Sequence, residues 1–217
     1  MQLKITETDQ MAKQAQDNQS ELNENESYTQ LQMMWPEHLL NAPPAVQLPS
    51  GYTLRTYRRG DEPRFCEVMG LAGWPVWNEE VLRPWLSRIL PEGWFMAADE
   101  ESSQIVATAM ALDDHSELHP FGGELGWLAR DPAHAGKGLG LAVCAAVTAR
   151  FIDAGYHAIH LYTEHRQLAA LKTCLKLGYI PFLYTPEMPE RWQVICGRLQ
   201  WRFTPDVWSF VKYLSCN

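Results

Sequence analysis

Three glycines open a helix in the stretch Trp127-Leu-Ala-Arg-Asp-Pro-Ala-His-Ala-Gly-Lys-Gly-Leu-Gly-Leu141. The residues before Asp131-Pro132 are typical of a strand, and residues 139–154 have the Ala, Leu and Val spacing of an amphipathic helix. Glycines let backbone amides approach a ligand closely, and the first turn of a helix carries free N–H groups. The stretch therefore predicts a site for a diphosphate group, to which Lys137 adds a positive charge.

Two other phosphate-binding motifs do not match this stretch. A Walker loop requires GxxxxGK followed by Ser or Thr, whereas Lys137 is followed by Gly138. A dinucleotide fingerprint requires GxGxxG, and neither Gly136-x-Gly138 nor Gly138-x-Gly140 has a third glycine at the required offset. A glycine-rich turn before a packing helix, with no ligand, stays an alternative interpretation.

The periodicity of the flanking sequence predicts an ordered series of strands and helices. Strands are expected over 52–57, 93–98, 105–112, 124–130, 159–162, 179–183 and 193–199. Helices are expected after the N-caps Asp61 and Asn78, with Pro84 shortening the second, and over 139–154 and 168–177. This order predicts an α/β fold with a mixed, mostly antiparallel central sheet and helices on both faces.

Composition divides the chain into three parts. Residues 1–46 are expected to form an acidic, partly disordered appendage, residues 47–200 the domain, and residues 201–217 a C-terminal extension with Trp208 and Phe210 available for docking. The first part contains an apolar patch that we expect to dock as a short helix, made of Tyr28, Leu31, Met33, Met34, Trp35, Leu39 and Leu40.

Charge and cysteine usage exclude several classes of protein. The formal net charge of −8 argues against a nucleic-acid partner, because phosphate binding requires a basic surface. The five cysteines show neither CxxC pairs nor zinc spacing, which favours a reduced, cytoplasmic chain with no metal. No apolar run approaches the ~20 residues that span a bilayer, so we expect no membrane association.

The glycine stretch resembles motif A of the GNAT acetyltransferase superfamily, and the nearest branch is that of mycothiol-synthase-like GNAT domains. The motif consists of Gln or Arg, two residues, Gly, one residue, and then Gly or Ala. Gly138 and Gly140 match this pattern. Ala135 occupies the leading position, a departure that removes one side-chain anchor for the cofactor. The resemblance implies the acyl-CoA N-acyltransferase fold.

A second segment is similar to the family signature Asn-x-x-Ala-x-x-x-Tyr-x-x-x-Gly-Phe. Gln167 takes the Asn position, and Ala170, Gly178 and Tyr179 agree with the signature in spacing and type. Cys174 replaces the tyrosine that usually protonates the leaving thiolate of CoA. The resemblance therefore implies either a cysteine general acid at this position or a packing residue with no catalytic role.

The resemblance implies acetyl-CoA, or another acyl-CoA, as cofactor. The pantetheine arm is expected to pair with the backbone of Leu128, Ala129 and Arg130, with an N–H near Leu128 facing the thioester oxygen. Gln167 is expected at the cofactor from the second signature. The remaining contacts, on or beside the diphosphate, are expected from Ala135, Gly136, Lys137, Gly138, Leu139, Gly140 and Leu141.

Glu124 is the expected general base, because it lies eleven positions before Ala135, as the base does in one branch of the family. A carboxylate at an apolar cleft can have its pKa raised into a useful range. An equally weighted alternative is a solvated charge at the end of a strand. Substitutes for the base lie on the preceding loop: Asp113, Asp114, His115 and His119, the last best placed by its unperturbed pKa.

The acceptor pocket is expected between the first two helices, with Trp74, Trp77 and Trp85, and a loop that carries Glu187 and Glu190. The resemblance implies acyl transfer from CoA to a primary amine of a small molecule or peptide. Loss of two motif positions leaves a second interpretation, a degenerate domain that binds acyl-CoA without turnover. An unrelated fold without cofactor is the third, and the oligomeric state, including a homodimer, stays open.

Overall fold

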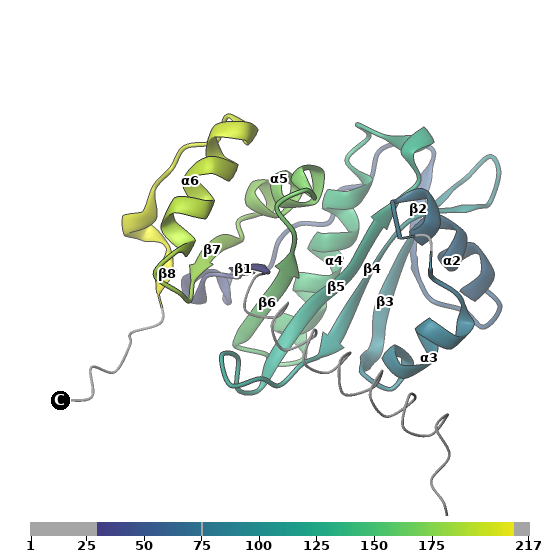
Figure 1. Ribbon diagram of the computed structural model, residues 1–217. Helices are drawn as coiled ribbons and strands as arrows, with labels where there is room; N and C mark the ends of the chain where they lie inside the picture. The colour runs from purple at the N-terminus through teal and green to yellow at the C-terminus, as the bar shows by residue number, and fades with distance from the viewer. Residues whose placement is uncertain (1–29, 75, 211–217) are drawn as a thin grey trace, which may run out of the picture.

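The computed structural model describes residues 30–74 and 76–210 (Figure 1). Its strands are β1 (Leu31–Met34), β2 (Tyr52–Thr56), β3 (Ile89–Asp99), β4 (Ile105–Asp113), β5 (Gly122–Arg130), β6 (Ala158–Thr163), β7 (Ile180–Leu183) and β8 (Ser209–Phe210). Its helices are α2 (Glu62–Leu71), α3 (Glu79–Leu86), α4 (Leu139–Asp153), α5 (Leu168–Leu177) and α6 (Met188–Leu199), with short 3-10 helices η1 (Glu37–Leu39), η2 (Pro132–His134) and η3 (Pro205–Val207). The disorder expected for the N-terminal end and the patch residue Tyr28 lie outside the described residues.

The strands form one mixed sheet in the order β2-β3-β4-β5-β6-β1-β7-β8. Neighbouring strands run antiparallel, except for the parallel pairs β5–β6 and β7–β8. The predicted α/β class, with a mostly antiparallel sheet, is confirmed. No helix in the described ranges is long and apolar enough to cross a membrane.

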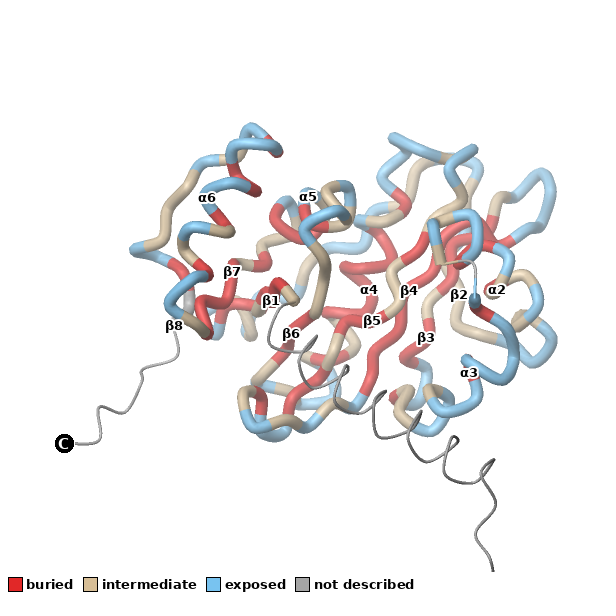
Figure 2. The backbone as a smooth tube through the Cα atoms, in the orientation of Figure 1, coloured by how far each residue is buried: buried red, intermediate tan, exposed pale blue. Residues whose placement is uncertain are grey.

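Strand β4 lies at the centre of the hydrophobic core, and Figure 2 shows it buried along most of its length. Because successive strand residues point to opposite faces, Ala109 and Ala111 pack in the cluster that contains α4. Met110 and Leu112 belong to the second cluster, with Phe65 of α2. Helices therefore cover both faces of the sheet, as predicted.

The two predicted helix caps differ in outcome. The Asn78 side chain accepts a hydrogen bond from Val81 N at 3.0 Å, so the cap of α3 is confirmed, and this helix ends soon after Pro84. Asp61 does not cap α2. Its carboxylate instead accepts two hydrogen bonds from Arg55, at 2.6 and 2.8 Å, because the guanidinium on β2 offers a stronger, bidentate partner.

The prediction that the N-terminal apolar patch forms a short helix is wrong for residues 31–34, which are strand β1, whereas Leu39 lies in the short 3-10 helix η1. This strand is antiparallel to β6 on one side and to β7 on the other. Leu31 and Met33 are fully buried, and Trp35 packs edge-on against Tyr179 at 5.2 Å. Four residues are too few for helical periodicity to be distinguished from a buried strand. Part of the segment expected to be an appendage therefore lies inside the sheet.

The strand predicted over 193–199 is also wrong, because these residues belong to helix α6. Its buried residues recur with helical spacing: Met188, Trp192, Ile195, Cys196 and Leu199. Pro189 lies in the first turn, where proline is tolerated. The helix covers β7, and the C-terminal Trp208 packs against Trp192 at 6.1 Å, so this part of the extension docks on the domain itself.

Candidate active site

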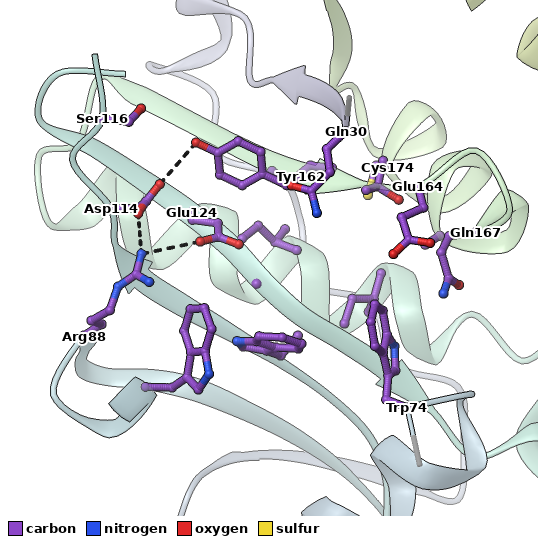
Figure 3. A pocket seen from close by; sticks show the side chains of 18 residues that line it. Gln30, Trp74, Arg88, Asp114, Ser116, Glu124, Tyr162, Glu164, Gln167 and Cys174 are labelled. Carbon is purple, nitrogen blue, oxygen red and sulfur yellow. Dashed lines mark hydrogen bonds and ion pairs between the residues drawn. The ribbon is translucent and has the colours of Figure 1, made fainter. Parts of the chain in front are cut away.

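Strands β5 and β6 separate to open a cavity. Their parallel ladder begins at Gly122↔Ala158 and ends at Glu124↔His160, after which β5 continues unpaired on this side to Arg130. The cavity between them has a volume of about 650 Å³ (Figure 3). Its charged, aromatic, polar and thiol side chains include Arg88, Asp114, Glu124, Glu164, Trp74, Trp85, Trp127, Tyr162, Gln30, Ser116, Gln167 and Cys174.

A β-bulge shapes the cavity wall in β5. Thr108 pairs with Ala129 and Met110 with Gly126, so two residues of β5 oppose one residue of β4. Trp127 in the bulge has a φ of 51°, an unusual value for a residue other than glycine. Its indole Nε1 is buried and has no hydrogen-bond partner among the described residues. The bulge therefore places Trp127 and Leu128 at the wall of the cavity.

The three residues expected to pair with pantetheine differ in their surroundings. Leu128 lines the cavity, and its neighbour in the bulge is Trp127. Ala129 is buried in the second hydrophobic cluster and pairs with Thr108. Arg130 directs its guanidinium to the carbonyl of Asp131 at 2.9 Å. Among the three side chains, only that of Leu128 lines the cavity.

The glycine loop presents free amides at the start of α4. Gly136 and Gly138 have positive φ values of 76° and 81°, and a Cβ added to either residue would have no atom within 4 Å. The first α4 bond runs from Ala142 N to Gly138 O, so the N–H groups of Leu139 to Leu141 have no helical acceptor. The open space beside Gly136 and Gly138 adjoins these amides, an arrangement that fits a diphosphate.

Two loop side chains contact the edge strand β2. Lys137 donates a hydrogen bond to the Tyr52 hydroxyl at 2.5 Å, and its ammonium lies 5.2 Å from the centre of that ring. His134, which no sequence pattern singled out, bonds to the same hydroxyl at 2.8 Å. Ala135 only closes η2 through its backbone. The Lys137 ammonium is therefore held at the rim of the loop.

The loop and the cavity meet at helix α5. An added Cβ at Gly140 would lie 3.8 Å from Thr173 of α5, which places the first turn of α4 against this helix. Gln167 at the start of α5 and Cys174 in its second half both line the cavity. Helix α5 therefore contacts the first turn of α4 through Thr173 and lines the cavity through Gln167 and Cys174.

Glu124 lies at the end of the cavity opposite Gln167, beside Arg88 and Asp114 (Figure 3). Its side chain is 15% exposed, and its Oε2 lies 3.6 Å from Arg88 Nη2. Burial, reinforced by the charge of Asp114 and opposed by Arg88, raises the pKa of Glu124 to about 7. The alternative of a solvated charge at a strand end does not agree with this burial.

Of the four loop residues considered as substitute bases, Asp114 lines the cavity. Asp113 and His115 are exposed and bond to each other at 2.9 Å. His119 is buried in the core, where its Nε2 contacts Gln32 Oε1 at 2.7 Å. Burial and the neighbouring His160 lower the pKa of His119 to about 3, so this side chain lies in the core and stays neutral at ordinary pH.

The tryptophans expected around the acceptor divide into two groups. Trp74 and Trp85 line the cavity, whereas Trp77 is buried and packs against Trp127 at 4.3 Å between ring centres. The acidic residues expected from the following loop, Glu187 and Glu190, do not line the cavity. The segment that carries them begins α6 and covers β7 instead.

Arg88 and Tyr162 line the site without having been selected from the sequence. Arg88 ends the loop after α3 and forms an ion pair with Asp114. Burial raises the pKa of Tyr162, so its hydroxyl, 3.4 Å from Asp114 Oδ2, keeps its proton. The alternation of strand β6 offered a signal for Tyr162, whereas the pairing of Arg88 with a residue on a distant loop left no local signal.

Comparisons with known proteins agree with this geometry. A model of the acetyltransferase (GNAT) family matches residues 54–179. The chain is 30% identical over 149 residues to the mycothiol acetyltransferase of Nocardia farcinica, covering 64% of this chain and 48% of that protein. It is 25% identical over 175 residues to the mycothiol acetyltransferase of Paenarthrobacter aurescens, covering 74% and 53%. The chain thus spans about half the length of these relatives.

A solved structure shares the fold. The crystal structure of a GCN5-related N-acetyltransferase from Sphaerobacter thermophilus superposes with a TM-score of 0.54 at 22% identity, covering 70% of this chain and 47% of that one. The family model covers more than half of this chain and includes the glycine loop, the splayed strands and α5. The chain therefore belongs to the acetyltransferase (GNAT) family.

Proposed function

We propose that the chain transfers an acetyl group, or another short acyl group, from CoA to a primary amine. The observation that carries this proposal is the position of Glu124, a buried carboxyl with a pKa near 7 at one end of a cavity. Helix α5, which lines the other end of the cavity, contacts the first turn of α4, where the free amides lie. The names of the two relatives support a small-molecule acceptor in preference to a peptide.

The chain's own groups suit each task of the transfer. The amides of Leu139 to Leu141 would hold the diphosphate, and the backbone at Leu128 would receive the pantetheine arm. Acetyl-CoA, when bound, supplies the activated acyl group. Glu124 would accept a proton from the acceptor ammonium, so that the neutral amine can attack the acyl carbon as the carbon–sulfur bond breaks.

The thiol of Cys174 would supply a proton to the departing sulfur and recover one from solvent. It lines the cavity, and the hydrogen bond that it shares with Cys144, together with burial, raises the pKa of the Cys144 thiol well above its usual value. Cys174→Ala is therefore expected to lower kcat about a hundred-fold, the low end of acid–base effects, with the Kd for acetyl-CoA unchanged. Cys144→Ala, which changes the same pair away from the cavity, serves as the control. An unchanged kcat in Cys174→Ala would assign this residue to packing alone.

The pH dependence follows from the ionisation of Glu124. The base must be deprotonated, and its pKa is raised to about 7, so kcat/KM should rise with pH up to about 7 and then level off. At an ordinary glutamate pKa the rise would be complete below about pH 5.5. A profile of kcat/KM from pH 5 to 9, with a thermal unfolding control at each pH, measures this. A profile already flat at pH 5.5 would contradict the role of Glu124.

Ala135 and Cys174, two departures from the family motifs, favour a second candidate function, the binding of acyl-CoA without turnover. The two functions are separated by a CoA-release assay with a panel of primary amines, run beside Glu124→Gln. Release that depends on both the amine and Glu124 supports catalysis. Thermal stabilisation by acetyl-CoA with no release for any amine supports the binding function.

A further inference from the structure

The charges at the acceptor end of the cavity are unevenly divided. We define this end by Arg88, Asp114 and Glu124, which lie together in Figure 3, whereas Glu164 lies at the other end near Gln167. Arg88 is therefore the one cation among the described residues of the acceptor end, and it lies between two carboxylates. The charge of any acceptor that enters must fit this arrangement.

The charge of Arg88 is already compensated. Its Nη2 forms an ion pair with Asp114 and lies 3.6 Å from Glu124, and its Nε donates to the Asp113 carbonyl at 3.1 Å. The guanidinium also lies 4.8 Å from the ring centre of Trp85. An acceptor carboxylate or phosphate would have to compete with a carboxylate that is already in place.

Asp114 is held in its ionised form from the protein side. Its Oδ2 lies 3.1 Å from His160 Nε2, and the His160 ring is fully buried and stacked on His119 at 3.9 Å. Burial opposes ionisation of Asp114, but the hydrogen bond to His160 and the charge of Arg88 outweigh it and lower the pKa of Asp114. Asp114 therefore keeps its negative charge at neutral pH.

The sum of these charges selects the acceptor. With Glu124 ionised as a base, the acceptor end carries two negative charges and one positive charge, and the ammonium of a primary amine balances the excess. A carboxylate or phosphate on the same acceptor would restore that excess in a place shielded from solvent, where an uncompensated charge is costly. A neutral body, by contrast, can lie against the aromatic walls formed by Trp85 and Trp127.

We propose that Asp114 is a specificity-determining residue which, by compensating Arg88, restricts the acceptor to primary amines whose body carries no carboxylate or phosphate. This inference rests on the proposed acetyl transfer. Asp114 does not touch the reacting atoms in this role. It sets which charge can accompany the amine.

The test compares two acceptors of similar size, 4-(aminomethyl)benzyl alcohol and 4-(aminomethyl)benzoate. For the natural sequence, kcat/KM for the alcohol should exceed that for the benzoate by about ten-fold or more. In Asp114→Asn the preference should shrink or reverse, because Arg88 loses one of its two carboxylate neighbours and the acceptor end loses its excess negative charge, while the Asn oxygen can still accept from His160. Asp113→Asn removes the same charge at an exposed position outside the cavity and should keep the preference.

Equal turnover of the two acceptors, or an unchanged preference in Asp114→Asn, would overturn the inference. If no variant acetylates either amine although acetyl-CoA binds, the proposed function fails, and the inference is then tested by binding. Titration of each amine into the CoA-bound protein, followed by tryptophan fluorescence, should give the same preference for the alcohol. Equal affinities in that titration would overturn it independently of catalysis.

Discussion

Replacing Glu124 with Gln is expected to lower kcat/KM for amine acetylation by about 10²- to 10⁴-fold, the usual contribution of a general base. Gln keeps the size of the side chain and its contact with Arg88 but cannot accept a proton from the acceptor. Because Glu124 lies at the end of the cavity away from the α4 amides, the Kd for acetyl-CoA should not change. CoA release at pH 8, with calorimetric titration of acetyl-CoA, measures both quantities.

Glu117→Gln is the matched control for this experiment. Glu117 lies on the loop between β4 and β5, is exposed, and does not line the cavity, so the variant loses the same charge without touching the site. Its turnover should equal that of the unchanged protein. If Glu124→Gln retained more than about a tenth of the activity, the assignment of Glu124 as the base would have to be given up.

The second large effect is expected at the glycine loop, where Gly138→Val should weaken acetyl-CoA binding about a hundred-fold. Gly138 has a φ of 81°, which a β-branched residue adopts only with strain, and it is the N-cap that directly precedes the free amides of α4. Loss of two hydrogen bonds to a charged group, at about 1.5 kcal/mol each, corresponds to roughly this factor. Titration calorimetry of acetyl-CoA gives the affinity.

Gly155→Val controls for the strain itself. Gly155 also has a φ of 81° and open space where a Cβ would lie, but it is located beyond the opposite end of α4. The two variants should therefore lose similar thermal stability, and only Gly138→Val should lose acetyl-CoA affinity. Undiminished affinity in Gly138→Val, or an equal loss in both variants, would contradict a diphosphate site on this loop.

The sequence predicted the elements that have both strong periodicity and clear end signals. Helix α5 has the predicted bounds, because Gly178 ends it and its apolar residues repeat at helical spacing. The prediction of a strand over 193–199 was wrong because it considered only the second half of α6. Met188 and Trp192, in the first half, extend the same apolar face with helical spacing. Strand β1 is too short for its period to identify it, and its position depends on partners distant in sequence.

The backbone features of the candidate site could be predicted from the sequence. The contacts between side chains on separate loops could not. The glycine loop follows from the local sequence, whereas Gln167 and Glu124 follow from the resemblance to the GNAT motifs. In the structure, Gln167 and Glu124 line one cavity. Arg88 comes from the loop after α3 and forms an ion pair with Asp114. No local sequence pattern predicts such a contact between two loops. The burial that raises the pKa of Glu124 likewise arises from tertiary packing.

The position of β1 has a consequence for synthesis of the chain. This strand leaves the ribosome before each of its partners, and its partners on β6 follow roughly 130 residues later, about ten seconds at common elongation rates. During that interval β1 has neither of its neighbours to pair with, because β6 and β7 both follow it in the chain. Among the described strands, the first to be made thus depends on two later ones, β6 and β7, for both of its ladders.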